Sequence, residues 1–422
     1  MMVYFDVLFV IVTSVVFWAV ALKAAVDICR RALALPQVNW RTLARKWINT
    51  ATAEGGAVHV YVKVVAFGLA ARAATVILAW LILATAEGNV LIREVFEAFN
   101  RWDAPHYLTL AQTGYTWTEN GRNILLVFFP LYPYLVRLVS MLTGSVLAAG
   151  FTVSYVTFCL GLVYVYKLAR LDFDAGTAWL AVVLVCIAPH GFFFGAPYTE
   201  SLFLLVTAMT LYYIRQRDWM LAGVAGGLAA FSRMVGVIFI IVAIAEIMLH
   251  HPILKRMRHC AWILLMPVGS LAYLYINWRV SGDAFRFMYY QADHWHNTSQ
   301  YFGATMLDQF RLIADFGAHP LTVGTLVPNV LAFTLAIGLL LYACVSRLNV
   351  IYIVYTVGYI LVSFAPSWLL SGGRYMVACV PLFIFLAHFM RTRPLWWGVV
   401  PAVSLGGLAV MMGMFIRGGS VF

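Results

Sequence analysis

The sequence predicts an all-α polytopic membrane protein with about twelve transmembrane helices, and three observations lead to this fold class. Hydrophobic residues make up 63% of the 422-residue chain and charged residues only 11%, whereas soluble domains have about 45–50% apolar and about 25% charged residues. The mean hydropathy is +0.88. Apolar runs of about 20 residues, the length needed to cross a bilayer, recur along the chain. This composition excludes a soluble globular enzyme, a disordered chain and a fibrous repeat.

The distribution of charge orients these helices. The net charge is +11, from 28 Lys and Arg against 17 Asp and Glu, and basic connections between spans favour the cytoplasmic side. The predicted crossings are residues 3–26, 58–86, 145–166, 177–195, 200–214, 219–232, 234–249, 261–279, 323–346, 349–366, 375–390 and 396–416. The basic connections, starting with residues 27–57, share one side only if the apolar stretch 124–143 does not cross. We therefore predict that 124–143, interrupted by Pro130 and Pro133, is a juxtamembrane helix on the external face.

The first external segment carries a group of reactive side chains. Asp103 precedes a helix whose first turn holds Pro105, and His106 and Tyr107 follow at the third and fourth positions, on the same side. A carboxylate with an imidazole and a phenol nearby suits general-base chemistry on a hydroxyl, with Gln112 further along the same helix. The alternative is that Asp103 is only an N-cap.

Three further charged positions lie at predicted span ends on the same side. Glu200 leads an apolar helix, where it could bind a hydroxyl, a sugar or a metal, or merely stabilise the helix dipole. Arg233 lies between two apolar stretches and could bind a phosphate, or form an interhelical salt bridge, for example to Glu200. Arg374, followed by Tyr375, resembles Arg233, with ordinary anchoring of a helix end as the alternative.

The long external loop 280–322 contains a potential metal-binding sequence. Asp293, His294 and His296 lie within four residues, a spacing that could hold a metal ion. Such short spacing is more typical of an exposed surface loop. We predict no metal site and no cofactor, although a divalent metal remains open.

Four stretches resemble a known family. RWDAPHYLTLAQTGY, FFPLYPYLVR, APYTESLF and LAGVAGGLAAFSRMVGV occur in this order. Together they resemble the PIG-V family, the GPI mannosyltransferase 2 type of membrane glycosyltransferase. The resemblance extends from about residue 58 to 250, and beyond that it depends on GGRYMVACVP. Residues 1–57 carry no matching motif.

The resemblance implies a GT-C type of helical bundle with a long first external loop that carries juxtamembrane helices. It implies a polyprenyl- or dolichyl-phosphate sugar as donor, mannose as the sugar, and a membrane glycolipid or glycan hydroxyl as acceptor. Asp103 would then be the catalytic carboxylate. Expected substrate-binding residues are His106, Tyr107, Gln112, Tyr132, Tyr198 and Glu200, and expected donor-phosphate ligands are Arg233, Arg374 and Tyr375.

The resemblance also implies a division of the chain into three parts and a location in the cell. We expect an additional span and basic cytoplasmic loop over 1–57, a catalytic transmembrane module over 58–279, and an external loop with C-terminal helices over 280–422. The active site would face the external or lumenal side, of the plasma membrane in a bacterium or of the endoplasmic reticulum in a eukaryote. Nucleic acid is not an expected partner.

Two other functions remain open at this stage. A transporter or lipid flippase would be built from paired broken helices in two repeated halves, and no such repeat is found in the sequence. A non-catalytic membrane subunit could retain the same fold. Release of polyprenyl phosphate from a polyprenyl-phosphate sugar would separate an enzyme from both.

Overall fold

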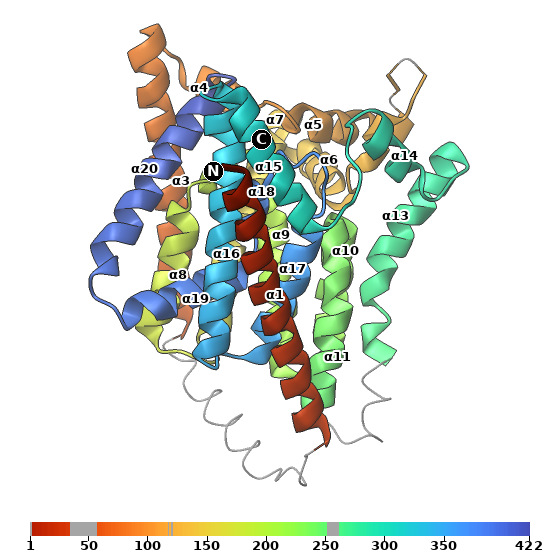
Figure 1. The fold of residues 1–422 in the computed structure, drawn as a ribbon. Coiled ribbons are helices and arrows are strands. Elements are labelled where there is room, and N and C mark those ends of the chain that lie inside the picture. The colour runs from red at the N-terminus through yellow and green to blue at the C-terminus, as the bar shows by residue number, and fades with distance from the viewer. Residues whose placement is uncertain (1, 34–56, 117, 120, 251–260) are drawn as a thin grey trace.

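The structure, a computed structural model, is an all-helical bundle that describes residues 2–33, 57–116, 118–119, 121–250 and 261–422 (Figure 1). Among the described residues, six helices are long and apolar enough to cross a membrane, and five further apolar helices are shorter. Together with α9 (Glu200–Gln216) they account for the twelve predicted crossings. The described residues contain isolated β-bridges but no β-strand. The predicted fold class is confirmed.

The helices follow the predicted spans closely. The other crossing helices are α1 (Met2–Leu33), α3 (Ala57–Glu87), α7 (Val146–Ala169), α8 (Ala175–Ile187), α10 (Trp219–Ser232), α11 (Phe239–His250), α13 (Met266–Ser281), α16 (Val327–Val345), α17 (Val350–Ser363), α19 (Val380–Arg391) and α20 (Trp396–Ile416). The described helices other than these crossing helices are α4 (Ile92–Ala98), α5 (Ala104–Thr113), α6 (Leu131–Thr143), α14 (Arg286–Asp293), α15 (Phe302–Phe316) and α18 (Gly372–Met376).

Two predicted spans are interrupted next to proline. The span predicted over 177–195 is helical only to Ile187, because Ala188 precedes Pro189 and is extended, with a φ of −55° and a ψ of 143°. A short 3₁₀ turn, η4 (Gly191–Gly195), follows. The span predicted over 375–390 divides into α18 and α19, and Pro381 lies in the first turn of α19.

Contacts between chain segments define two ends of the bundle. At one end, which we call the α5 end, Arg374 pairs with Asp103, Arg233 pairs with Glu200, and Ser367 bonds Thr298. At the other, which we call the basic end, Arg215 pairs with Asp172, Arg391 pairs with Asp174, and Lys23 bonds the carbonyl of Cys344. The predicted external segments thus lie together at the α5 end. The described basic connections lie together at the basic end. Two of the basic connections, residues 34–56 and residues 251–260 with Lys255, Arg256 and Arg258, lie outside the described residues.

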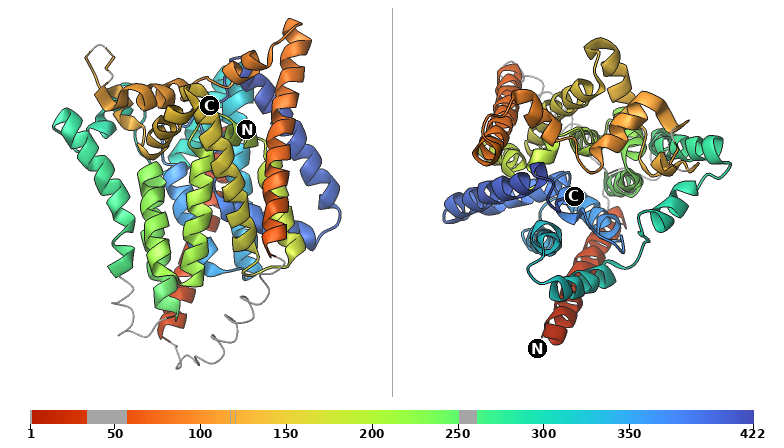
Figure 2. Two further views of the ribbon diagram at one scale, coloured as in Figure 1. Left: turned by 180° about the vertical axis from the view of Figure 1, so that it is seen from behind. Right: turned by 90° about the horizontal axis from the view of Figure 1, so that it is seen from above.

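The stretch 124–143 forms a short helix at the α5 end. After a 3₁₀ turn, η3 (Ile124–Val127), the 13-residue α6 is about 20 Å long at 1.5 Å per residue. The hydrocarbon core is about 30 Å thick. α6 buries Leu131, Tyr132 and Val136 on one face, exposes Leu138 and Met141 on the other, and lies beside α5 across this end of the bundle (Figure 2). This agrees with the predicted juxtamembrane helix.

A buried arginine holds the bend after α8. Arg72, in the middle of α3, is 1% exposed. Its Nη1 donates to the carbonyl of Gly191 at 2.7 Å and its Nη2 to that of Cys186 at 3.2 Å. Carbonyls at a helix C-terminus have no partner within the helix, so a buried cation there satisfies them. Arg72 thereby fixes the start of the segment that leads to Glu200. The sequence analysis assigned it no role.

Candidate active site

Four charged side chains from distant parts of the chain form a connected group at the α5 end. Arg374 Nη2 lies 2.8 Å from Asp103 Oδ2, and Arg374 Nε lies 3.2 Å from Glu200 Oε1. Arg233 Nη2 donates to the same Glu200 oxygen at 3.2 Å. We call Asp103, Arg374, Glu200 and Arg233 the four-charge cluster. Its formal charges cancel, which is how buried charges are tolerated in a low-dielectric surrounding.

Asp103 faces this cluster instead of capping its helix. It occupies the N-cap position of α5, but its side chain makes no capping hydrogen bond. The preceding residue, Trp102, has a φ of +56°, a left-handed conformation that is uncommon for a bulky residue. The hydroxyl of buried Tyr198 donates to the carbonyl of Arg101 at 2.6 Å and supports this turn. The N-cap interpretation of the side chain is therefore wrong, while Pro105 does lie in the first turn as predicted.

Glu200 and Arg233 lie at positions where neighbouring helices begin or end. Glu200 is the first residue of α9, and its side chain is 0% exposed. Arg233 is extended, with a φ of −156°, between α10 and the 3₁₀ turn η5 (Met234–Ile238). Its guanidinium lies 4.9 Å from the centroid of the Tyr375 ring, within cation–π range. The salt bridge between Arg233 and Glu200, considered from the sequence, is present.

Arg374 is the centre of the cluster and is buried, so the interpretation of it as an exposed helix-end anchor is wrong. Its side chain is 5% exposed. An amide pair fixes the backbone before it: Asn329 Oδ1 accepts from the Gly373 N–H at 3.0 Å, and Asn329 Nδ2 donates to Gln309 Oε1 at 3.2 Å. Neither amide was singled out from the sequence, because polar residues in a span signal a role without naming the partner.

We expect Gly373→Ala to lower activity by moving Arg374. A Cβ on Gly373 would lie 2.5 Å from Cε1 of the buried His190 ring, closer than real Cβ contacts. α18 would have to shift, and a misplacement of about 1 Å can cost about 10²-fold in rate. The measurement is the turnover of the purified variant. Gly338→Ala on α16 is the matched control, because nothing lies within 4 Å of a Cβ there, and it should keep full activity. Equal activity of both variants would contradict this role of the Gly373 turn.

Buried tyrosines surround the cluster. Tyr107 packs edge-on against Tyr132 at 5.5 Å and Tyr198 at 6.2 Å between ring centroids. The Tyr132 hydroxyl donates to the carbonyl of Gly150 at 3.0 Å, which fixes the floor of this aromatic layer. Burial, followed by the charges of Asp103 and Glu200, raises the pKa of Tyr107. Its phenol therefore stays protonated and can donate a hydrogen bond.

His106 joins the cluster to the long loop 280–322. Its ring centroid lies 5.2 Å from Phe128 and 6.4 Å from Trp295, a residue the sequence analysis did not select. Burial lowers the pKa of His106, although nearby Asp103 opposes this shift, so the imidazole is neutral near pH 7. An aromatic side chain of this loop thus lies beside His106 and Phe128.

The potential metal ligands of this loop have other partners. Asp293 forms an ion pair with Arg122, and His294 lies 3.9 Å from Glu119. In the described part of the chain, no three His, Cys, Asp or Glu side chains gather as metal ligands would.

Gln112 is a predicted site residue that does not lie with the four-charge cluster. It is exposed and lines a different cavity, beside Asn100, Thr109 and Ser145, on another side of α5 from Tyr107. Tyr375, in contrast, lies against both arginines of the cluster, with its ring 4.9 Å from Arg233 and 5.4 Å from Arg374.

Several buried polar atoms of the cluster are available to a ligand. Nη1 of Arg233, Nη1 of Arg374 and Oε2 of Glu200 have no hydrogen-bond partner among the described residues, and the same holds for the hydroxyls of Thr199 and Ser232 beside them. Unsatisfied buried donors and acceptors are costly unless something binds them. Two guanidinium N–H groups suit phosphate oxygens, and a carboxylate oxygen with hydroxyls suits sugar hydroxyls.

Comparison with known proteins gives similar segments over the central helices. The profile of the family described as dolichyl-phosphate-mannose-protein mannosyltransferase matches residues 129–278. GPI mannosyltransferase 2 of Drosophila pseudoobscura pseudoobscura is 29% identical over 124 residues, which cover 27% of this chain and 26% of the relative. GPI alpha-1,6-mannosyltransferase 2 of Homo sapiens is 26% identical over 141 residues, covering 31% of this chain and 28% of the relative. The matched part thus spans about a quarter of the length of these relatives.

The fold has a counterpart among solved structures. The crystal structure of ArnT from Cupriavidus metallidurans, bound to undecaprenyl phosphate, superposes with a TM-score of 0.50 and 17% sequence identity, over 76% of this chain and 61% of the other. At this identity the match shows the fold alone. The predicted resemblance to the GPI mannosyltransferase 2 proteins is therefore confirmed over the matched segments, and the chain shares its fold with ArnT.

Proposed function

We propose that this protein is an inverting glycosyltransferase that moves mannose from a polyprenyl-phosphate sugar to a hydroxyl of a membrane-associated acceptor. The observation that carries the proposal is the four-charge cluster, in which the partly exposed carboxylate of Asp103 pairs with Arg374, and Arg374 and Arg233 each have an unpartnered Nη1. The GPI mannosyltransferases with matching segments, and the undecaprenyl phosphate bound to ArnT, support the sugar and the donor class.

The proposed reaction is a single displacement at the anomeric carbon. The acceptor oxygen forms a bond to this carbon while the bond to the phosphate oxygen breaks, and the configuration inverts. The carboxylate of Asp103, which is 28% exposed, takes the proton of the acceptor hydroxyl. The departing phosphate gains negative charge, which Nη1 of Arg233 and of Arg374 stabilise.

Other residues would orient the substrates. Oε2 of Glu200 can accept a hydrogen bond from a sugar hydroxyl, and the protonated phenol of Tyr107 can donate one. His106 lies near Asp103 and beside Trp295, and we expect it to contact the acceptor. We propose that the site faces the external or lumenal side, because the described basic connections lie at the opposite end.

The direct test is incubation of the purified protein with labelled polyprenyl-phosphate mannose and a membrane glycolipid extract as acceptor. We expect label in the acceptor and release of polyprenyl phosphate. A transporter or flippase, which the comparisons do not favour, would move the donor and leave it intact. Intact donor with every acceptor fraction would overturn the proposal.

Arg233→Met tests the phosphate role. We expect at least about a tenfold loss of turnover, or about 1.4 kcal/mol of barrier, with a small change in Tm because Arg374 still neutralises Glu200. Arg233→Lys keeps the charge but loses the fork, so its activity should lie between those of wild type and Arg233→Met. Activity and Tm are measured on the same preparations. A large fall in Tm with unchanged specific activity of the folded protein would assign Arg233 a purely structural role.

A further inference from the structure

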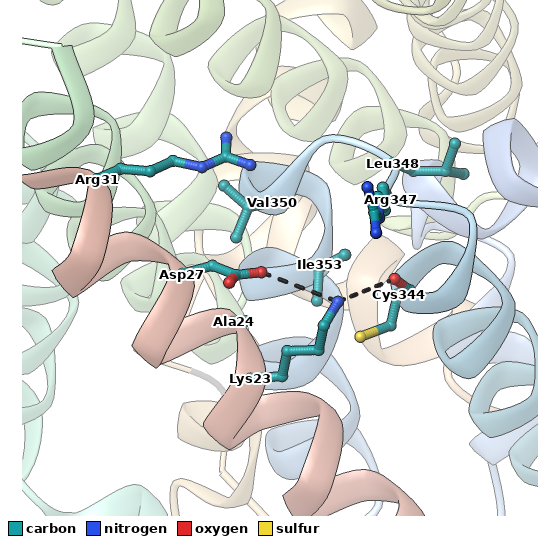
Figure 3. Close-up of a pocket in the computed structure, with 9 residues that line it drawn as sticks. All are labelled: Lys23, Ala24, Asp27, Arg31, Cys344, Arg347, Leu348, Val350 and Ile353. Atoms are coloured by element: carbon teal, nitrogen blue, oxygen red, sulfur yellow. Dashed lines mark hydrogen bonds and ion pairs between the residues drawn. The ribbon is translucent and has the colours of Figure 1, made fainter. Parts of the chain in front are cut away.

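A cavity at the basic end is separate from the candidate active site. It has a volume of about 300 Å³ and lies between α1 and the connection from α16 to α17. Figure 3 shows Arg31 and Arg347 extending from opposite walls, with Lys23 between them. Asp27 is the one acidic residue among its lining residues. The lining thus carries three basic groups and one acidic group.

The two arginines of this cavity, Arg31 and Arg347, have no side-chain partner among the described residues. Lys23 is 3.9 Å from Asp27 and donates to the carbonyl of Cys344 at 3.2 Å. The guanidinium groups of Arg31 and Arg347 make no ion pair or hydrogen bond with any described residue. Arg347 is held in a left-handed conformation, with a φ of +54°, in the turn between α16 and α17. Two unpaired guanidinium groups facing one cavity are suited to a phosphate.

The surroundings of the cavity indicate a lipid as the source of this phosphate. Leu22 and Val26 of α1, and Leu341 and Val345 of α16, are exposed large apolar side chains on the two helices that border it. On membrane helices such side chains contact hydrocarbon. A basic pocket between spans at the level of the headgroups can hold an anionic headgroup while the acyl chains lie along the helices.

Such a ligand would connect α1 to the rest of the bundle. Toward the α5 end, α1 is held by ring contacts of Phe9 with Phe310 at 5.1 Å and of Phe17 with Phe302 at 4.9 Å. At the basic end, Lys23 donates a hydrogen bond to the carbonyl of Cys344, and Ala24 and Ile28 of α1 are buried. We propose that the cavity binds the phosphate of an anionic membrane phospholipid, which Arg31 from α1 and Arg347 from the α16–α17 turn clamp together.

The test uses native mass spectrometry and thermal unfolding of the full chain in nanodiscs of phosphatidylcholine with or without phosphatidylglycerol. The double variant R31Q/R347Q should retain phosphatidylglycerol at least about tenfold more weakly, because each arginine contributes a charge contact. It should also lose the rise in Tm that this lipid gives the wild type. Arg30→Gln is the matched control: Arg30 is exposed on the same helix and does not line the cavity, so this variant should behave like the wild type.

Three outcomes would overturn the proposal. Equal weakening by Arg30→Gln would show general attraction to a basic surface. An equal rise in Tm with soluble glycerophosphate in phosphatidylcholine nanodiscs would make the ligand a free phosphate. Unchanged lipid retention in the double variant would exclude the two arginines. Should the double variant fail to fold in phosphatidylcholine alone, the single variant Arg347→Gln provides the same readouts.

Discussion

Asp103→Asn should lower the rate of mannosyl transfer by about 10²–10⁴-fold, the range expected for loss of a general base. Asparagine has nearly the same shape but cannot take a proton from the acceptor hydroxyl. The side chain of Asp103 is 28% exposed, and Arg374 keeps Glu200 as a partner, so Tm should change little. Single-turnover transfer from labelled polyprenyl-phosphate mannose measures the first effect, and thermal unfolding in detergent measures the second.

Asp315→Asn is the matched control for this experiment. Asp315 is an exposed carboxylate on α15, at the same end of the bundle, and its replacement should leave transfer unchanged. If Asp103→Asn also kept near-normal turnover, the mechanism would need another base. Glu200 would be the next candidate by position, although it is completely buried.

Glu200→Gln should produce the largest loss of stability in the cluster, about 3–5 kcal/mol. Oε1 of Glu200 lies 3.2 Å from both Arg233 Nη2 and Arg374 Nε, and the side chain is 0% exposed. Removing its charge leaves two buried guanidinium groups with only Asp103 to balance them. The measurement is the free energy or temperature of unfolding in detergent, with folded protein recovered after purification as a supporting readout.

Two comparisons make this test specific. Glu97→Gln removes an exposed pair between Arg93 and Glu97 on α4 and should leave Tm nearly unchanged. The double variant Glu200→Gln with Arg233→Met should be more stable than Glu200→Gln alone, because it restores the balance of charge. Equal Tm values for Glu200→Gln and wild type would mean that the cluster contributes nothing to folding.

The topology could be predicted because it depends on properties that act along the chain. Apolar runs of sufficient length locate the spans, and the basic residues of the connections assign the sides. Excluding 124–143 followed from this charge pattern alone. The helix breaks near Pro189 and Pro381 could have been predicted from the rule for residues around proline. They were missed because the apolar runs continue through both prolines.

Most residues of the candidate site could be selected from the sequence, but the contacts between them could not be predicted. A charge at a span end signals function, yet nothing in the sequence states that Arg374 bridges Asp103 and Glu200. Trp295 was missed because an aromatic residue in a loop is usually unremarkable. The position of Gln112 could have been anticipated: it follows Asp103 by nine residues, or about two and a half helical turns, and therefore faces away from it.

The balanced charges of the four-charge cluster also affect how fast the lipid phosphate product would dissociate. A sugar phosphodiester carries one negative charge, whereas the lipid phosphate left after transfer carries up to two, so unopposed arginines would hold the product more tightly than the donor. Glu200, and Asp103 once it has released the proton taken from the acceptor, would offset this attraction after transfer. In the proposed mechanism the carboxylates would thus favour product release, and weakening that offset should make transfer more sensitive to inhibition by added polyprenyl phosphate.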